Sequence, residues 1–387
     1  MILQGLEIQN KGIGNIFIQD EKIERITYGL NNQYKREDIH IDFEGSYVFP
    51  GLINSHDHLE FNLFPQLGNR IYRNYLEWGT DIHTEDKKVI QRVLSVPKSL
   101  RMAWGIYKNL VCGVTTVVHH GGEVNDSPHL INILSGFKSL HSVKLERYWK
   151  CKLNNPLNKN KDFVIHIGEG TDQDMCKEIE DIVRWNLLRK NLIGVHGIAM
   201  NQQQAKKFKA IIWCPASNFF LYNATGKFNE IKTSTHILFG TDATVSADWN
   251  IWNHLRQART TCMLTDNELI NSTNTIAAKV WSLEKVGKIE ESFYADLVVA
   301  RNDNMQKEAH DHFFATNPES IQMVLSKGNI VLFDASLYAQ LNNVIAEKYS
   351  SIYINGQKKY VKGNIHKLIR EIKNYYPEAN LFANIDE

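Results

Sequence analysis

The chain contains 387 residues, of which 43% are hydrophobic and 22% are charged, and its formal net charge is +1. This balance is typical of a globular protein with a large core, and it gives no electrostatic reason to expect a nucleic-acid or membrane partner. No basic segment followed by an apolar run opens the chain, and no apolar run reaches about 18 residues. We therefore expect neither a signal peptide nor a transmembrane helix.

The cysteines are odd in number and widely scattered, and none forms a Cys-X-X-Cys pair. This pattern predicts reduced, buried thiols and a cytoplasmic protein rather than a disulfide framework. One of them, Cys214, lies beside other suggestive residues, so chemistry at its thiol is the minor alternative. The full set is Cys112, Cys151, Cys176, Cys214 and Cys262.

Residues 1–47 have the pattern of short strands. The stretch 12–26 places apolar and β-branched residues on both sides of a polar turn, which predicts a hairpin. We expect a small β module here.

The next segment, residues 48–58, is an apolar run that ends in His56-Asp-His58. Side chains alternate along a strand, so His56 and His58 should point the same way while Asp57 points away. Two imidazoles on one face can bind a divalent metal, whereas two surface histidines in a turn are the alternative.

Aromatic residues follow, and we expect residues 59–82 to form a loop or broken helix over the mouth of a pocket, or else to contribute ordinary core aromatics. Residues 85–110 have helical spacing. Residues 112–122 predict a second buried parallel strand that ends at His119 and His120, of which one should face the pocket and the other its wall. The aromatic side chains are Phe61, Phe64, Tyr72, Tyr75 and Trp78.

The remainder of the central region alternates strands and helices, with a polar residue at successive strand ends. This order predicts an α/β protein with a parallel β/α barrel, whose chemistry lies at the carboxyl ends of the strands. We count seven barrel strands rather than eight, because residues 145–162 leave little room for another helix and strand. The predicted strands are 142–145, 163–169, 192–197, 211–213 and 236–242; the predicted helices are 126–137, 172–189 and 201–209; and 152–162 is a predicted loop.

Residues 292–300 and 321–333 are again prone to form strands, and we expect them to rejoin the N-terminal β module. An amphipathic helix near 364–375 closes the chain. The predicted division is 1–47 and 286–387 for the β module, with 48–285 as the barrel.

Three imidazoles and one carboxylate come from three separate strand ends. A divalent metal held by them would keep a position open for water and lower the pKa of that water toward neutral. Glu169 could shuttle protons, and His196 could polarise the atom that becomes the oxyanion. The candidate ligands are His56, His58, His166 and Asp242, and Asp242 could also take the proton of the water.

Each residue has a structural alternative. His166 or His196 alone could be a hydrogen-bonded core histidine. Asp242 could cap a helix, and Glu169 could be a solvated carboxylate in a first helical turn. Their joint occurrence favours the metal, because several ionisable groups buried without a partner would be costly.

These motifs occur in the order of the amidohydrolase superfamily, and the chain resembles its deaminase and chlorohydrolase branch. The segments that carry the resemblance are Phe49-Pro-Gly-Leu-Ile-Asn-Ser-His-Asp-His58, Gly113-Val-Thr-Thr-Val, His166-Ile-Gly-Glu169, Val195-His-Gly, Cys214-Pro-Ala-Ser-Asn218, Gly240-Thr-Asp242 and Ala295-Asp-Leu-Val-Val.

The resemblance implies a distorted TIM barrel with a β-sandwich built from both termini. It implies one divalent metal on the four candidate ligands, usually zinc and sometimes iron. It also assigns Glu169 as proton shuttle, His196 as polarising residue and Asp242 as base. The candidate substrate contacts are Trp78, His119, His120 and Asn218.

Two departures from the family pattern matter. Binuclear members carry a carboxylated lysine on the fourth strand, and here Lys144 or Lys150 would be a forced match, so we expect a single metal. The same region is shortened, which argues against a large nucleoside as substrate.

The resemblance therefore predicts hydrolytic deamination of a small nitrogen heterocycle. Opening of a cyclic amide, removal of another leaving group and a non-catalytic binding protein are the alternatives. A nucleic-acid deaminase is excluded, because its His-X-Glu and Pro-Cys-X-X-Cys signature is absent from the sequence. Dimers are frequent in the family, so a homodimer is the expected assembly.

Overall fold

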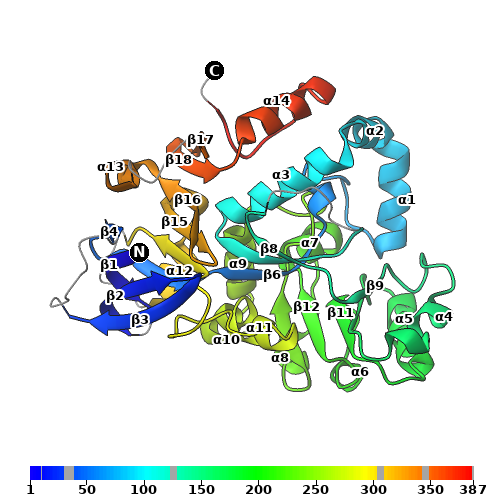
Figure 1. Ribbon diagram of the computed structural model, residues 1–387. Coiled ribbons are helices and arrows are strands. Elements are labelled where there is room, and N and C mark those ends of the chain that lie inside the picture. Colours follow the sequence, from blue (N-terminus) through cyan, green and yellow to red (C-terminus); the bar gives the residue numbers. More distant parts are fainter. Residues whose placement is uncertain (10, 30–38, 123–128, 303–308, 342–347, 386–387) are drawn as a thin grey trace.

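Strands from both ends of the chain meet in one ten-stranded sheet (Figure 1). The computed structural model describes residues 1–9, 11–29, 39–122, 129–302, 309–341 and 348–385. The strands of this sheet are β1 (Ile2–Ile8), β2 (Gly12–Gln19), β3 (Lys22–Tyr28), β4 (His40–Asp42), β5 (Tyr47–Pro50), β14 (Leu297–Ala300), β15 (Ile321–Ser326), β16 (Asn329–Asp334), β17 (Tyr349–Ile354) and β18 (Gln357–Lys362).

The junction between the two ends of the chain is an antiparallel pairing of β14 with β5. The predicted return of the C-terminal strands to the N-terminal module is therefore confirmed, as is the hairpin of β2 and β3. These described strands all belong to one sheet, so the β-sandwich stays a prediction.

The centre of the chain forms two parallel sheets. Most of their strands are buried, as expected where helices cover a sheet, whereas the short strands 132–134 and 138–140 are partly exposed. The first contains β6 (Leu52–Asp57), β7 (Val114–His119) and β8 (Asn132–Leu134); the second contains β9 (Lys138–Leu140), β10 (Phe163–Ile167), β11 (Leu192–His196), β12 (Ala210–Trp213) and β13 (His236–Phe239). A parallel bridge between Asp57 and Asp242 joins the end of β6 to the segment after β13.

One extended segment gives an edge strand to both parallel sheets. β8 pairs with β7 and β9 pairs with β10, and only residues 135–137 separate β8 from β9. A helical crossover needs about a dozen residues, so none can form between them. The helix predicted over 126–137 is therefore wrong in its described part, and residues 126–128 lie outside the described residues. The strand predicted over 142–145 is also wrong, because the strand of this region is β9 and residues 143–145 form a turn.

Most helices predicted from apolar residues at helical spacing lie where the sequence places them, including the last one, α14. The helix predicted over 85–110 is instead two helices, α2 and α3. Val96 is extended (φ −71°, ψ 127°) because it precedes Pro97, which cannot continue a helix. The helices are α1 (Tyr75–Glu85), α2 (Lys87–Ser95), α3 (Lys98–Val111), α4 (Trp149–Leu153), α5 (Gln173–Trp185), α6 (Gln202–Ala205), α7 (Pro215–Tyr222), α8 (Phe228–Ile231), α9 (Ile251–Thr260), α10 (Asp266–Ser272), α11 (Thr275–Val280), α12 (Ala309–Ala315), α13 (Tyr338–Leu341) and α14 (Ile365–Tyr375); the 3₁₀ turns are η1 (Leu59–Phe61), η2 (Pro156–Asn158), η3 (Pro318–Ser320) and η4 (Ala335–Leu337).

Helix α3 lies directly on the segment that follows β6. A Cβ atom at Gly105 would lie 2.3 Å from the carbonyl oxygen of Leu59, so only glycine allows this approach. The contact fixes the chain next to His58. Helix α14 packs on the outer side of α3 (Figure 1). Within the described residues, no helix combines the length and apolarity that a membrane crossing needs.

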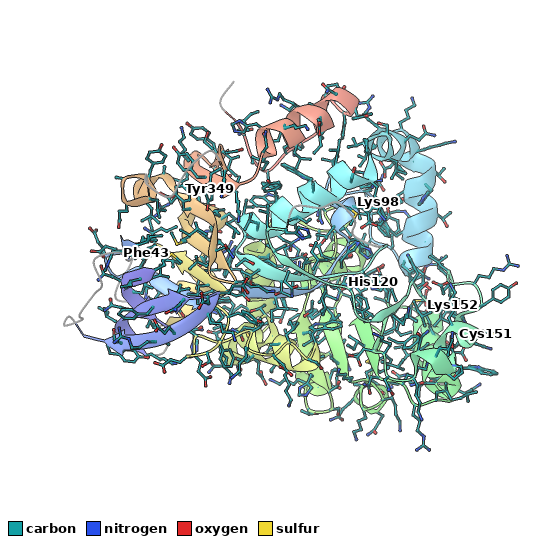
Figure 2. All side chains as sticks on the ribbon, in the orientation of Figure 1. Phe43, Lys98, His120, Cys151, Lys152 and Tyr349 are labelled. Atoms are coloured by element: carbon teal, nitrogen blue, oxygen red, sulfur yellow. The ribbon has the colours of Figure 1, made fainter. Side chains whose placement is uncertain are left out.

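The cysteines are all free thiols, in agreement with the prediction, but not all are buried. Cys112 and Cys214 are buried, whereas Cys151 and Cys262 are exposed. Figure 2 shows Cys151 at the periphery of the molecule. Burial raises the pKa of the Cys214 thiol well above its ordinary value, which disfavours the thiolate that nucleophilic chemistry would need.

Candidate metal centre and its cavity

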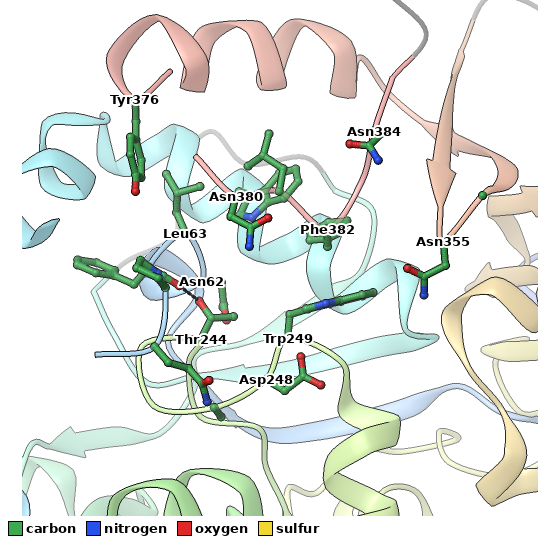
Figure 3. A pocket seen from close by; sticks show the side chains of 17 residues that line it. Asn62, Leu63, Thr244, Asp248, Trp249, Asn355, Tyr376, Asn380, Phe382 and Asn384 are labelled. Atoms are coloured by element: carbon green, nitrogen blue, oxygen red, sulfur yellow. Dashed lines mark hydrogen bonds between the residues drawn. The ribbon is translucent and has the colours of Figure 1, made fainter. Parts of the chain in front are cut away.

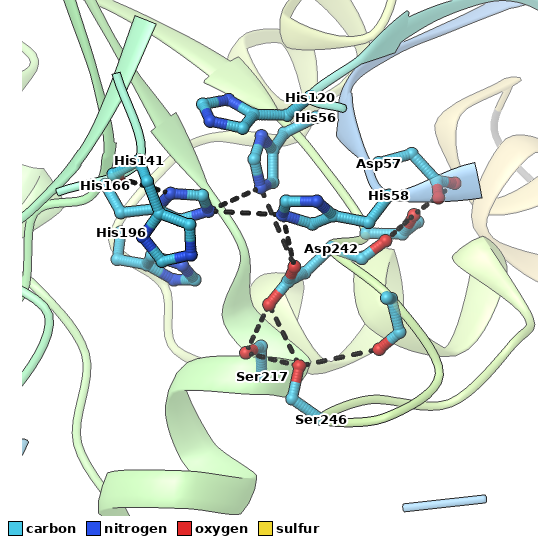
Figure 4. A network of polar contacts seen from close by, with 12 residues as sticks. His56, Asp57, His58, His120, His141, His166, His196, Ser217, Asp242 and Ser246 are labelled. Atoms are coloured by element: carbon cyan, nitrogen blue, oxygen red, sulfur yellow. Dashed lines mark hydrogen bonds and ion pairs between the residues drawn. The ribbon is translucent and has the colours of Figure 1, made fainter. Parts of the chain in front are cut away.

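The four predicted ligands converge on one point (Figure 4). The Nε2 atom of His166 lies 3.1 Å from Nε2 of His56 and 3.3 Å from Nε2 of His58. Asp242 Oδ1 lies 3.6 Å and 3.7 Å from the same two nitrogens. Ligand atoms about 2.0–2.1 Å from zinc at tetrahedral angles lie about 3.3 Å apart, so these separations fit one ion.

Two of the ligands belong to the end of β6, and they point the same way, as alternation along a strand predicts. Asp57, between them, points in the opposite direction into a fully buried polar cluster. It accepts a hydrogen bond from Lys108 Nζ at 2.9 Å and from Asn109 Nδ2 at 2.8 Å, both on α3. This ion pair anchors the backbone from which His56 and His58 project.

The third ligand, His166, has a defined tautomer. Its Nδ1 atom lies 2.9 Å from the backbone carbonyl of His141, which can only accept, so Nδ1 carries the proton and Nε2 presents its lone pair to the site. Burial lowers the pKa of His56 to about 4 and that of His166 well below its ordinary value. Neutral imidazoles are the form that binds a metal ion.

The fourth ligand, Asp242, divides its two oxygens between two tasks. Oδ1 faces the histidines, whereas Oδ2 accepts hydrogen bonds of 2.9 Å from the hydroxyls of Ser217 and Ser246. Burial opposes ionisation of Asp242, but its contact with His56 and the other surrounding histidines hold its pKa well below the ordinary value. The residue is therefore a carboxylate with one oxygen free for a cation.

Glu169 and His196 lie at the same end of the cavity. Tyr222 donates a hydrogen bond of 2.8 Å to Glu169 Oε1, and burial raises the pKa of Glu169. His196 Nδ1 lies 2.8 Å from Asn218 Oδ1, and its buried Nε2 lies 3.7 Å from Glu169 Oε2 and has no hydrogen-bond partner among the described residues. A carboxyl group and an imidazole thus face each other beside the four ligands.

The two adjacent histidines at the end of β7 point in different directions. The His120 ring lies among the ligand rings, with its centroid 4.5 Å from that of His166, and Nε2 is 2.7 Å from Ser139 Oγ. His119 points toward Glu60, with Nε2 3.5 Å from Oε2.

A cavity of about 340 Å³ opens onto the four-ligand cluster. Trp78 lines it, and so do Glu169 and His196, in agreement with their predicted positions. The other predicted substrate contacts, His119, His120 and Asn218, are not among the described residues of its lining, so their role in substrate binding stays a prediction.

A larger cavity of about 540 Å³ is lined in part by residues 62–66, which follow His58 in the chain (Figure 3). Trp104 and Trp249 line it, and Phe382 stacks on both with ring centroids 4.1 Å and 5.2 Å away. None of the four ligands belongs to its described lining. The smaller cavity is therefore the candidate active site, because it opens onto the four-ligand cluster and is lined by Glu169 and His196.

Four contributions to the site were not anticipated from the sequence. They are the carbonyl and ring of His141, the hydroxyl of Tyr222, and the hydroxyls of Ser217 and Ser246. Ser217 lies inside the segment Cys214-Pro-Ala-Ser-Asn218, whose order could have singled it out. His141 and Tyr222 have no local signal, because their partners His166 and Glu169 are distant in the chain, whereas Ser246 lies four residues after its partner Asp242.

The chain is similar in sequence to known hydrolases. A model of the amidohydrolase family matches residues 157–331. A 5-methylthioadenosine/S-adenosylhomocysteine deaminase of Clostridium tetani is 21% identical over 383 residues, covering 82% of this chain and 89% of the relative. The enzyme of the same name from Pyrococcus furiosus is 22% identical over 430 residues, covering 87% and 95%.

Solved structures show the same fold. An adenosine deaminase from Xanthomonas campestris with bound zinc has a TM-score of 0.70 at 12% identity, with 98% of both chains covered. An atrazine chlorohydrolase from Arthrobacter aurescens complexed with zinc has a TM-score of 0.70 at 15% identity, covering 97% of this chain and 99% of the other. This likeness implies a TIM-like barrel.

The comparisons confirm the resemblance to the deaminase and chlorohydrolase branch of the amidohydrolase superfamily. Together with the cluster of three histidines and one aspartate, they indicate a metal-dependent hydrolase that acts on carbon–nitrogen bonds.

Proposed function

We propose that this protein hydrolyses the exocyclic amine of a small nitrogen heterocycle, with one bound zinc ion. The observation that carries the proposal is the convergence of four ligand atoms beside Glu169 and His196 in a single cavity. A scaffold or binding protein would not need a buried carboxyl and a buried imidazole next to a metal cluster.

The ion, held by His56, His58, His166 and Asp242, would supply the Lewis-acid chemistry that makes water nucleophilic near neutral pH. Asp242 then takes a proton from the attacking water, while Ser217 and Ser246 hold the carboxylate in place. Glu169, whose pKa burial raises, is the group placed to give a proton to the ring nitrogen. The amine leaves as ammonia after it receives the proton held by Asp242. The added hydroxyl then loses its proton to Glu169 as the ring carbonyl forms, which returns both carboxyl groups to their starting states.

His196 has a conditional part in this scheme. Asn218 Oδ1 accepts a hydrogen bond from Nδ1–H of His196, so the neutral imidazole presents only a lone pair at Nε2. Donation from Nε2 to a developing oxyanion therefore requires the protonated imidazole, which Glu169 would stabilise as a carboxylate once its own proton has passed to the substrate.

Several wider features belong to the same proposal. The two parallel sheets and the likeness in fold support a distorted β/α barrel over 48–285, with 1–47 and 286–387 forming a β-sandwich. The free cysteines support a cytoplasmic location. A homodimer stays a prediction. The named relatives act on nucleosides, so their similarity weighs against the expectation that a nucleoside is too large.

The test combines metal analysis of the purified protein with a screen for ammonia release from heterocyclic amines and cyclic amides. We expect one zinc per chain and ammonia from at least one heterocyclic amine. Ring-opened product from a cyclic amide, with ammonia from no substrate, would refute deamination.

A matched pair of variants tests the assigned base. Asp242→Asn should abolish turnover while the folded state is retained, whereas the same change at the exposed Asp174 on α5 should not alter it. Zinc content is measured in both proteins. Substantial activity in Asp242→Asn would contradict the role of Asp242.

A further inference from the structure

The 340 Å³ cavity has apolar walls, whereas the end that opens onto the four-ligand cluster, the metal end, is polar. Leu67 and Ile82 are buried in the wall, and Ile90 and Val245 are partly buried beside them. These side chains come from three different parts of the chain: the segment after η1, helices α1 and α2, and the segment after Asp242. A ligand that fills the cavity therefore places most of its surface against hydrocarbon.

The two large polar aromatics of the wall present their rings rather than their polar atoms. The Tyr75 hydroxyl donates a hydrogen bond of 2.9 Å to Glu178 Oε1, behind the wall. Trp78 Nε1 donates to the carbonyl of Leu67 at 3.0 Å. Because both donors already have partners, neither residue offers a hydrogen bond to a polar substituent.

The rim of the cavity is also apolar, although it is exposed. Phe61, Leu94 and Leu145 are 37%, 48% and 57% exposed, and all three belong to the lining. They come from η1, α2 and the segment after β9, so packing within one element does not explain their exposure. Large apolar side chains grouped at the mouth of a cavity indicate a surface that a ligand covers.

The charges of the lining disfavour an anionic substituent. Among the described residues of the lining there is no lysine or arginine, and its carboxylic acids are Glu169 and Asp242. Histidines are its basic side chains, the exposed His83 of α1 included, so a carboxylate or phosphate would lose its hydration without meeting a permanently charged cationic side chain.

We propose that the substrate is an uncharged heterocyclic amine that has an apolar alkyl, alkylthio or aryl substituent reaching from the ring at the metal end to the rim. This inference rests on the proposed deamination. It assigns Leu94 and Leu145 as residues that determine specificity, and it predicts discrimination against analogues with an amino-acid, carboxylate or phosphate group.

The test uses two amine scaffolds, adenine and 2-amino-1,3,5-triazine, each unsubstituted, with an n-butyl group and with a 3-carboxypropyl group. For the scaffold that releases ammonia, we expect kcat/KM of the butyl form to exceed that of the unsubstituted form by about tenfold or more. It should exceed that of the carboxypropyl form by about a hundredfold. Equal values for the three forms would overturn the inference while deamination stands.

Binding to the zinc-loaded protein, measured by calorimetry, separates the two proposals. If neither scaffold releases ammonia but the butyl forms bind about tenfold more tightly than the unsubstituted forms, deamination fails and the inference survives. If no form binds and none is turned over, the inference is overturned as well.

A charge placed on the rim provides the matched variant. Leu94→Arg should shift the ratio of carboxypropyl to butyl activity, or of their affinities, by about tenfold toward the carboxypropyl form. The control is Leu157→Arg, at a leucine that is 91% exposed and outside the described lining of this cavity, and it should leave the ratio unchanged. Leu145→Arg serves as the second rim variant if Leu94→Arg does not fold. An unchanged ratio in the folded rim variant would overturn the inference.

Discussion

Replacing Lys108 with methionine would leave the carboxylate of Asp57 buried without its counter-charge. Lys108 is 1% exposed and Asp57 is fully buried, and Lys108 Nζ also lies 3.0 Å from Thr241 Oγ1. Removal of one partner of a buried ion pair costs about 3–5 kcal/mol. We expect the lower part of this range, because Asn109 and Asn62 still donate hydrogen bonds to Asp57.

The variant should also weaken zinc binding, since Asp57 lies between His56 and His58. Loss of a group that supports metal ligands typically reduces metal affinity by about 10–100-fold. The measurements are the free energy of unfolding from denaturant titration without metal, and zinc affinity by competition with a chelator.

Two further variants complete this experiment. Asp57→Asn combined with Lys108→Met should be less destabilised than the sum of the single changes, with a coupling of about 2 kcal/mol. Lys177→Met, which removes an exposed ion pair with Asp174, is the control and should leave both quantities unchanged. A loss below about 1 kcal/mol for Lys108→Met, with unaltered zinc affinity, would refute the reasoning.

Three other predictions concern catalysis, pH and metal. Glu169→Gln should lower kcat by about 10²–10⁴-fold because the proton donor is lost, and a smaller loss in steady-state assays would count against that role. Burial raises the folded-state pKa of Glu178 to about 7 from 4.5. Ionisation of Glu178 therefore lowers the free energy of unfolding by nothing below pH 4.5, by an increasing amount as the pH rises, and by about 3 kcal/mol above pH 7. Glu178→Gln keeps a hydrogen-bond acceptor for Tyr75, and its free energy of unfolding should therefore fall less between pH 5 and 8 than that of the unaltered protein. The same fall in both proteins would show that Glu178 is not the cause. Zinc at about 1,000 times its dissociation constant should add about 4 kcal/mol to the free energy of unfolding, and His166→Ala should abolish that gain; equal gains in both proteins would place the ion elsewhere.

The ligand set was readable from the linear order of residues because each ligand lies at or just beyond the end of a strand. His56 and His58 share a face through the two-residue period of β6, and His166 lies within β10. Parallel strands bring their carboxyl ends to the same edge, so strand assignment alone predicted that these side chains would meet. The terminal strands and helix α14 were predictable for the same reason, since hydrophobic periodicity is a local property.

The segment 130–145 shows the limit of local information. A short apolar run is compatible with a helix or a strand, and here pairing with β7 and then with β10 decided for the extended form. The break between α2 and α3 could have been anticipated, because Pro97 is visible in the sequence.

The chemistry of the ligands depends on contacts that no local pattern predicts. The proton on His166 is directed by the carbonyl of His141, Asp242 is oriented by Ser217, and Asp57 is balanced by Lys108. Periodicity along the chain therefore specifies which side chains reach the centre. Their protonation and orientation follow from hydrogen bonds between segments far apart in the chain, because the choice of partner depends on how the sheets and helices pack.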